Sequence, residues 1–206
     1  YPTFNNNEWV VLYDSSKETP YYNNIPLFNN KISSYADLIT FRNLVNSGTT
    51  YNNQTITLLS DIDITGDEWI PIGTATSPFN GLFDGQNHKI SNFKCYANNR
   101  LNQIGLFGNA TYTIQNLIIE DVFIGEQINT KQKSDFGSLL GCLTKTTLTP
   151  TITNCHANNC KILIYELNSN YEFHVGGLIG NVDNASINNC GIKNCIIDIY
   201  GGSYIG

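Results

Sequence analysis

Six cysteines are the residues of this chain whose chemistry depends most on spacing. Four of them form two C-x4-C pairs, Cys155/Cys160 and Cys190/Cys195, and the second pair follows the first by 35 residues. If that interval is one repeat of stacked parallel strands, Cys155 lies beside Cys190 and Cys160 beside Cys195, about 4.8 Å apart. This Cα separation suits a disulfide, and it equally suits free thiols that pack as small apolar residues. The spacing therefore predicts stacked thiols or disulfides and leaves both states open.

Asp61 and Asp63 are the carboxylates best placed for catalysis or for binding calcium. They are two residues apart on an expected strand, hence on one face, and Asp67 and Glu68 follow in the next turn. Paired acids can ligate calcium through oxygen or cleave glycosides by general acid–base chemistry. The alternative is that they accept hydrogen bonds from turn amides or face water. We expect this structural role, and the sequence leaves calcium near Asp61 and Asp63 open.

The three histidines, His88, His156 and His174, belong to no catalytic or metal-binding motif. The chain contains no HExxH, GxSxG, Walker A or GxGxxG sequence, and no C-x2-C or histidine pair at ligand spacing. The histidines are therefore expected to be exposed or hydrogen-bonded. The sequence predicts no catalytic residue, no cofactor and no metal site.

Three N-glycosylation sequons begin at Asn53, Asn109 and Asn184. Asn109 and Asn184 each follow a glycine-bracketed apolar segment, which is expected to end at a surface corner. If the chain passes through a eukaryotic secretory route, these asparagines become acceptor sites, and the last two are the best placed.

The composition excludes several classes of protein. The 206 residues are 41% hydrophobic but only 14% charged, with a net charge of −6 and two arginines. An acidic, arginine-poor surface does not suit nucleic acid, and no apolar run approaches the roughly 20 residues of a membrane span. The chain has no methionine, so we expect a mature product or a piece of a longer chain.

Internal repeats organise the sequence. Four glycine-bracketed apolar segments recur, and Ile-x-Asn followed by an apolar residue or cysteine comes after each of the first three, with an earlier copy at Ile90, Asn92 and Phe93. The segments are GLFG (105–108), SLLG (138–141), GLIG (177–180) and SYIG (203–206). Residues 125–136 and 144–151 look like insertions into a core repeat of about 25 residues. Such repeats cannot bury their apolar faces alone and must stack.

The strand-like runs indicate which kind of repeat fold the chain adopts. ILIY (162–165) and CIIDIY (195–200) are β-branched and too short for helices, with Asn and Gly between them as turn residues. We therefore predict an all-β fold, a right-handed parallel β-helix (solenoid). A capping box at Ser34–Asp37 and helical apolar spacing predict one capping α-helix over 35–47, which would cover the open first coil.

The predicted organisation has three parts. Residues 1–33 form a segment with one strand (8–13) and loops, residues 34–48 carry the capping helix, and residues 49–206 form the repeats. The repeats are expected to continue beyond 206 in a longer parent chain.

An ordered series of motifs resembles the GLUG-repeat proteins. After the helix come a DIDI strand (61–64), W-x-P-I-G (69–73), F-x-G-x-F-D-G (79–85) and the glycine-bracketed coils, over about residues 33–206. Proteins of this kind are large secreted or surface proteins, including bacterial adhesins and non-catalytic β-helical regions of IgA-peptidase-like proteins. The resemblance implies an architecture, not an activity. Ser138 and Ser203 depart from it, because the family favours glycine there.

The sequence thus predicts a non-enzymatic structural or adhesive module, extracellular or on a cell surface. Its partners would be a host or matrix glycan or protein, or other copies of itself, bound through insertion loops and amide-rich corners. One alternative is a carbohydrate-active enzyme that uses the acidic face. The other is a subunit of an extracellular filament joined end to end through its last coil.

Overall fold

The computed structural model describes residues 28–96, 102–128, 133–166 and 172–200. The strand predicted at 8–13 lies outside these ranges. One helix accompanies nineteen strands in this part of the chain, and every strand pairing is parallel. The predicted all-β class, with parallel strands, is confirmed. No helix of the described residues is both long and apolar enough to cross a bilayer.

The largest sheet has nine strands and bends along its length. Its strands pair in two runs, β1-β2-β4-β9-β13-β17 and β3-β5-β9-β13-β18, because the long strands β9 and β13 take part in both. The strands are β1 (Lys31–Ile32), β2 (Thr55–Leu58), β3 (Ile62–Asp63), β4 (Leu82–Asp84), β5 (Lys89–Ser91), β9 (Thr113–Glu120), β13 (Thr151–Asn158), β17 (Ser186–Asn188) and β18 (Gly191–Lys193).

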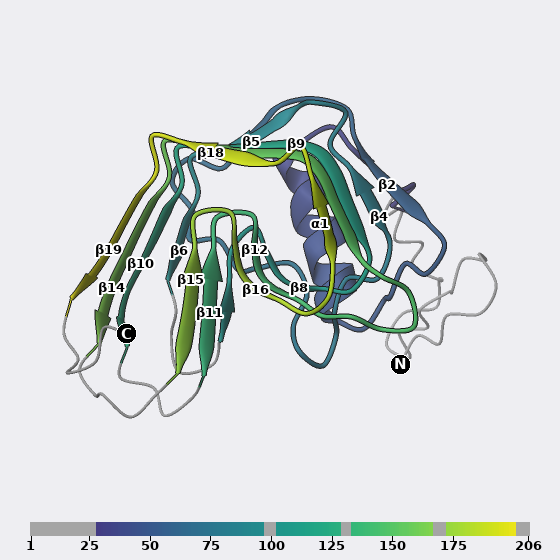
Figure 1. Ribbon diagram of the computed structural model, residues 1–206. Helices are drawn as coiled ribbons and strands as arrows, with labels where there is room; N and C mark the ends of the chain where they lie inside the picture. Colours follow the sequence, from purple (N-terminus) through teal and green to yellow (C-terminus); the bar gives the residue numbers. More distant parts are fainter. Residues whose placement is uncertain (1–27, 97–101, 129–132, 167–171, 201–206) are drawn as a thin grey trace, which may run out of the picture.

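Three smaller sheets complete the cross-section (Figure 1). The four-stranded sheet contains β6 (Lys94–Tyr96), β10 (Phe123–Ile128), β14 (Lys161–Glu166) and β19 (Ile196–Tyr200). A second contains β7 (Gln103–Ile104), β11 (Ser134–Gly137) and β15 (Phe173–Gly176). The third contains β8 (Phe107–Ala110), β12 (Leu140–Leu143) and β16 (Ile179–Val182).

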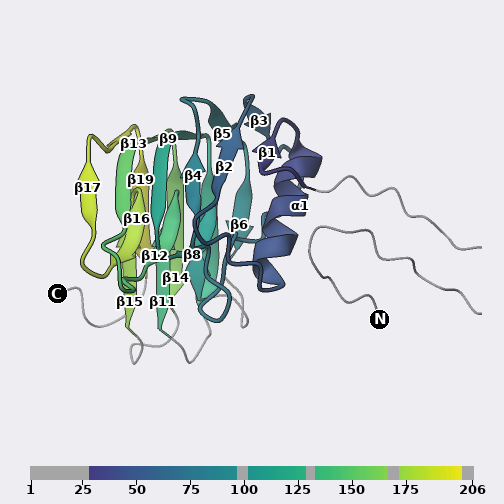
Figure 2. The same cartoon turned by 90° about the vertical axis from the view of Figure 1, so that its right-hand side faces the viewer.

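The chain visits these sheets in a fixed order. From β6 it passes through the four-stranded sheet, the β7–β11–β15 sheet, the β8–β12–β16 sheet and the nine-stranded sheet, and it repeats that path from β10 and again from β14. Each pass lies beside the previous one, so the strands line up from α1 at one end to β17 at the other (Figure 2). Equivalent residues therefore stack in columns. Cys95, Ile124 and Ile162 form one such column and are almost fully buried.

The columns correct one alignment made from the sequence. Cys155 lies beside Leu117, as predicted. The copy at Ile90, Asn92 and Phe93 does not belong to that repeat position, because Ile90 pairs with Ile119 and not with Ile114. Phe93 belongs instead to the column of Val122, Cys160 and Cys195. The carbonyl of each of the first three residues accepts a hydrogen bond from the backbone N–H that follows the next member of the column. These donors are the N–H groups of Phe123, Lys161 and Ile196. The direct neighbour of Cys160 in this column is therefore Val122, and Phe93 lies one pass farther along.

The predicted helix is confirmed to within one residue as α1 (Tyr35–Asn46). Its first turn is a capping box, in which the Ser34 hydroxyl accepts from the Asp37 backbone N–H at 3.2 Å and the Asp37 carboxylate accepts from Ser33. Ser47 caps the carboxyl end, and Gly48 follows with a φ of 108°. These short-range contacts explain why the sequence alone located the helix.

The buried face of α1 covers the first strands of the stack (Figure 2). Leu38, Phe41 and Val45 are fully buried. The Phe41 ring meets Phe79 edge-on at 5.4 Å and Phe83 at 5.9 Å. The phenylalanines of the F-x-G-x-F-D-G motif therefore form the surface on which the helix packs.

The W-x-P-I-G motif anchors the other side of α1. The buried Trp69 indole N–H donates to the Leu106 carbonyl at 3.0 Å. Asn46, at the end of the helix, donates to the Pro71 carbonyl and accepts from the Gly73 N–H at 2.7 Å. Gly73 has a φ of 80° and touches the Asn109 carbonyl, so a side chain there would be strained and would clash.

The glycine-bracketed segments lie where two sheets come closest. A Cβ added to Gly137 would lie 2.5 Å from the Leu140 oxygen and 2.7 Å from the Gly180 nitrogen. One added to Gly141 would lie 2.5 Å from the Ile104 nitrogen. At Ser138 the hydroxyl donates to the Gly177 carbonyl and is buried, so serine replaces glycine there with its polar group satisfied.

Candidate functional site

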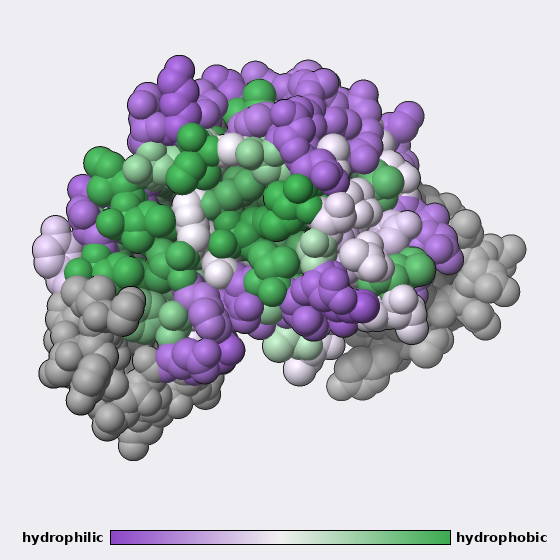
Figure 3. Space-filling view, in the orientation of Figure 1, coloured by the Kyte–Doolittle hydropathy of each residue, from purple (hydrophilic) through white to green (hydrophobic). Residues whose placement is uncertain are grey.

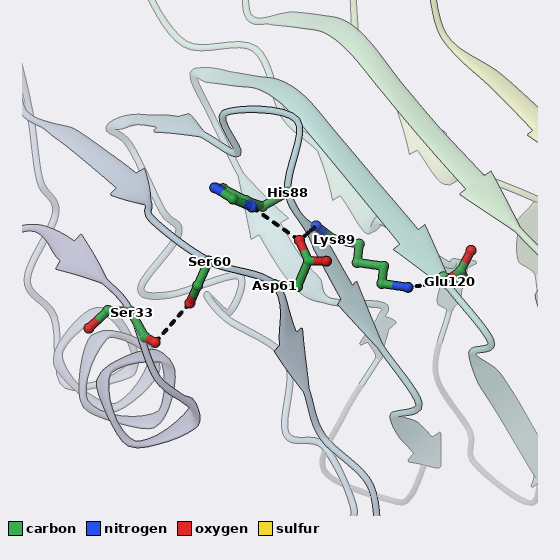
Figure 4. Close-up of polar contacts among 6 residues, drawn as sticks. All are labelled: Ser33, Ser60, Asp61, His88, Lys89 and Glu120. Carbon is green, nitrogen blue, oxygen red and sulfur yellow. Dashed lines mark hydrogen bonds and ion pairs between the residues drawn. The ribbon is translucent and has the colours of Figure 1, made fainter.

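Four charged or titratable side chains meet on the outer face of the β3–β5–β9 run (Figure 4). Strand alternation places them there, because the neighbouring Ile62, Ile90 and Ile119 point inward. An Asp61 oxygen accepts from the Lys89 backbone N–H at 3.0 Å and lies 3.1 Å from His88 Nδ1. The Lys89 side chain donates to Glu120 at 2.8 Å.

The electrostatics of this cluster follow from those contacts. The Lys89 backbone hydrogen bond is the main reason that the pKa of Asp61 lies below its usual value. The hydrogen bond to Glu120 raises the pKa of Lys89. All of these groups are exposed enough for water and salt to screen them. The cluster is a set of polar surface contacts in which the Asp61 carboxylate is favoured over its protonated form.

Asp63 is held in the same way. Asp61 and Asp63 do share the outer face, as predicted, with Ile62 buried between them. Asp63 accepts from the hydroxyl and N–H of Thr65 and from the Asn92 amide, and the Thr65 hydroxyl is the main cause of its lowered pKa. A glycosidase acid needs a raised pKa. Neither aspartate has one, so this pair is not arranged for general acid catalysis.

The turn acids lie apart from that pair. Asp67 accepts from the Tyr35 hydroxyl of α1 at 2.8 Å, and Glu68 forms a backbone bridge with Lys94. Among the residues that the structure describes, no three acidic, histidine or cysteine side chains come together as a set of metal ligands.

Ser60, His88 and Asp61 lie near one another without forming a hydrolytic triad. The Ser60 hydroxyl donates to the Ser33 carbonyl at 2.8 Å, and Figure 4 shows it directed toward Ser33 and away from His88. His88 uses Nδ1 on Asp61. A nucleophile must hydrogen-bond to its base, and this serine does not.

Farther along the same outer face is an open hollow of about 360 Å³. It lies where Gly191 leaves space beside His156. Its lining residues are Ile118, His156, Asn158, Gly191, Ile192 and Lys193. No two acidic groups face each other in it, so it offers a binding surface of mixed character and no reactive pair.

A buried acid in the β7–β11–β15 sheet was not predicted from the sequence. Asp135 is 4% exposed and lies 2.7 Å from His174 Nδ1 on the next strand. The other ring nitrogen of His174 lies 3.2 Å from Glu172, which also contacts Lys133 at 3.5 Å. The sequence did contain a signal for this pair. The closing glycines Gly141 and Gly180 are 39 residues apart, and the same interval separates Asp135 from His174.

Cys142 lies next to Asp135 but is not activated by it. Burial is the main cause of its raised pKa, and hydrogen bonding to the Asp135 carboxylate raises it further. A reactive cysteine needs the opposite shift, toward the thiolate. The group is therefore a buried polar contact between two sheets.

The asparagine corners form a hydrogen-bonded ladder that ends on a carboxylate. Asn189 donates to Asn154 at 3.1 Å, Asn154 to Asn116 at 3.0 Å, and Asn116 to Asp84 at 3.0 Å. The three asparagines have positive φ values between 50° and 54°, a conformation that asparagine tolerates better than most residues. Gln86 and Gln115 also donate to Asp84. The aspartate of F-x-G-x-F-D-G is thus the acceptor at the base of the ladder.

Replacing Asp84 by asparagine is expected to reduce the free energy of unfolding by about 2 kcal/mol at pH 7, because several hydrogen bonds to a charged acceptor are lost. Burial raises the pKa of Asp84, but the bonds from Asn116, Gln86 and Gln115 outweigh burial and lower it. The folded pKa is below the unfolded one, so this stability is present above about pH 4 and disappears as the pH falls through the folded pKa.

Urea unfolding at pH 7 and pH 3 tests this expectation. The wild type and the D84N variant should differ at pH 7 and approach each other at pH 3. D183N removes the same charge from an exposed loop residue and should match the wild type at both pH values. An equal loss for D84N at both pH values would contradict the assignment.

One sequon prediction is wrong. Asn109 does not lie at an exposed corner: it is 5% exposed on β8, and its amide nitrogen faces the Thr144 hydroxyl at 3.5 Å. The expected surface position of Asn109 is therefore the part that the structure corrects. Asn53 and Asn184 are exposed, with φ values of 58° and 47°, and their glycosylation stays a prediction.

No disulfide joins two cysteines among the residues that the structure describes. Cys155 and Cys160 are buried, and burial is the main reason that their pKa values rise to about 12. Cys190 and Cys195 are half-buried in the last coil. The buried pair is protonated at neutral pH and so cannot serve as catalytic nucleophiles.

Comparison with known proteins adds one structural similarity. No family model and no curated protein matches the chain. A crystal structure of a Bacteroides ovatus protein, named as a candidate immunoglobulin A1 protease, is similar at 16% sequence identity and a TM-score of 0.48, over 85% of this chain and 78% of that one.

Proposed function

We propose that this chain is a non-enzymatic structural or adhesive module of an extracellular or cell-surface protein. Its architecture would be a right-handed parallel β-helix of the GLUG-repeat kind, capped by α1. The observation that carries the proposal is the repeated passage through the same four parallel sheets, with apolar columns inside. Such a stack is rigid and can hold loops away from a surface.

The state of the polar groups supports a structural role. Asp61, Asp63 and Asp84 each accept hydrogen bonds from neighbouring passes or turns and have lowered pKa values. The Asp135 carboxylate is hydrogen-bonded to the His174 ring. These acids join one pass of the stack to the next, which is what a scaffold requires and what an acid–base catalyst does not.

Recognition would fall to the loops between sheets. The loop at 144–150 is exposed over residues 145–149 and presents Leu148, which is 56% exposed, beside several threonines. Exposed apolar and hydroxyl groups on a rigid support suit a host or matrix glycan or protein. The filament alternative is less favoured, because α1 covers the end on which a second copy would have to stack.

A binding screen with an activity control tests the proposal. Beads that carry the protein are presented to matrix proteins and to a glycan array. Saturable binding is expected, and it should be lost when residues 145–149 are replaced by glycine and serine. D61N/D63N is the matched control on another face and should bind normally. The same protein is also incubated with a polysaccharide panel and with peptide substrates.

The outcomes separate the alternatives. Release of sugar or peptide by the wild type that D61N/D63N abolishes would overturn the non-enzymatic role and favour the carbohydrate-active alternative. Binding that survives the loop replacement would overturn the assignment of the loop. Absence of binding to every ligand would overturn the adhesive role.

A further inference from the structure

The last described coil runs from β15 to β19. Strands β15 to β19 each pair with an earlier strand on one side only. Ile187 is 46% exposed and Ile192 is 54% exposed, although their column neighbours Ile152 and Ala157 are fully buried. Figure 3 shows apolar residues gathered across this face of the described chain, with polar residues above and below them.

Two cysteine columns join this coil to the one before it. Cys190 repeats the contact of Cys155 one pass later, since the Cys155 Sγ donates to the Ile114 carbonyl and the Cys190 Sγ to the Ile152 carbonyl. The thiols of Cys155 and Cys190 are within hydrogen-bonding contact.

The second column repeats this arrangement at the other corner of the coil. The thiols of Cys160 and Cys195 are also within hydrogen-bonding contact. Both pairs span adjacent parallel strands, whose Cα atoms are about 4.8 Å apart, within the range that a disulfide accepts.

We propose that Cys155–Cys190 and Cys160–Cys195 are a pair of oxidation sites whose disulfides clamp the last described coil onto the coil before it. Because the two bonds lie at opposite corners of one coil, either one alone leaves the other corner free to open.

The oxidant is a low-molecular-weight disulfide such as oxidised glutathione. The thiolate of half-buried Cys190 attacks one glutathione sulfur and expels a glutathione thiolate, which takes up the proton. The Cys155 thiolate then attacks the Cys190 sulfur and expels the second glutathione. One disulfide is formed and one is reduced, with two glutathione thiols as products. Cys195 and Cys160 react likewise, and the high pKa of the buried partners makes the second step slow.

The remaining cysteines are internal controls. Cys142 stacks between Asn109 and Asn181, and Cys95 lies beside Ile124. Neither has a cysteine as its column neighbour in these pairings. Both should therefore keep their thiols under conditions that oxidise the other four.

The experiment equilibrates the full chain in glutathione buffers, from reducing to oxidising. Remaining thiols are alkylated under denaturing conditions and counted by intact mass. Trypsin cleavage after Lys145, Lys161 and Lys193 places Cys155 and Cys160 in one peptide and separates Cys190 from Cys195. In the oxidised wild type, the peptide with Cys155 and Cys160 should be disulfide-linked to both the Cys190 peptide and the Cys195 peptide. In Cys190→Ala it should be linked only to the Cys195 peptide, and in Cys195→Ala only to the Cys190 peptide.

A second readout measures the clamp itself. Native trypsin cleavage at Lys193, which is exposed in the terminal coil, should slow by roughly tenfold on oxidation of the wild type, because opening is suppressed. Cys142→Ala should behave like the wild type, and the Cys190→Ala/Cys195→Ala double variant should show no change on oxidation. Six alkylated cysteines at every potential, a bond to Cys95 or Cys142, or a bond between Cys155 and Cys160 would each overturn the proposal.

Discussion

Replacing Phe41 by alanine is expected to lower the free energy of unfolding by about 3–5 kcal/mol, the usual cost of emptying a fully buried aromatic site. Phe41 is the centre of an aromatic cluster, with its ring 5.4 Å from both Tyr51 and Phe79 and 5.9 Å from Phe83. Alanine is a better helix former than phenylalanine, so the loss would come from packing between α1 and the first coil.

Thermal and urea unfolding followed by circular dichroism measure this effect, and binding of a hydrophobic dye reports exposure of the first coil. Thr40→Ala is the matched control on the exposed side of α1, where the change should stay within about 0.5 kcal/mol. If F41A and T40A were equally stable, the helix would not be a cap on which the stack depends.

Replacing Gly137 by alanine is expected to cost about 3 kcal/mol, at the upper end of overpacking effects. The added methyl group would lie within 2.7 Å of two backbone atoms on neighbouring strands, Leu140 O and Gly180 N. Backbone atoms of packed strands cannot move aside as a flexible side chain can. For a chain of this size the melting temperature should fall by roughly 6–12 °C.

Gly191→Ala is the matched control. It also adds one methyl group to a strand glycine, but the added Cβ would meet only His156 Nδ1, at 3.5 Å. The unfolded chain loses freedom on this change, so the variant should be neutral or slightly more stable. Urea midpoints that fall equally in G137A and G191A would show that close approach is not the reason for glycine in the repeat.

Some of the fold could be predicted because its signals are local. The Ser34–Asp37 box and the apolar spacing of Leu38, Phe41 and Val45 act within four residues of one another, and α1 begins and ends almost where they indicate. The repeated Ile-x-Asn pattern likewise placed Cys155 in the column of Leu117.

Insertions limited the rest of the prediction. The segment 125–136 was interpreted as one insertion, but β10 extends to Ile128 and β11 begins at Ser134. The passes differ in length, so a single period could not align every sheet. Ile90 was assigned to the wrong column, and the pairing of Asp135 with His174 was missed, although the interval of 39 residues between glycines contained that information.

The sequence alone was sufficient for the parallel all-β class, the helix, the outward direction of Asp61 and Asp63 and the neighbours of Cys155, because alternation, capping and repeat spacing are properties of the chain itself. Only the tertiary structure decided which groups donate hydrogen bonds to the two aspartates, that Asp84 ends a ladder of asparagines, that Asn109 is buried and that Gly137 has no room for a methyl group. Each of these depends on atoms brought together from passes roughly 30–40 residues apart. Small differences in insertion length between the passes decide which atoms meet.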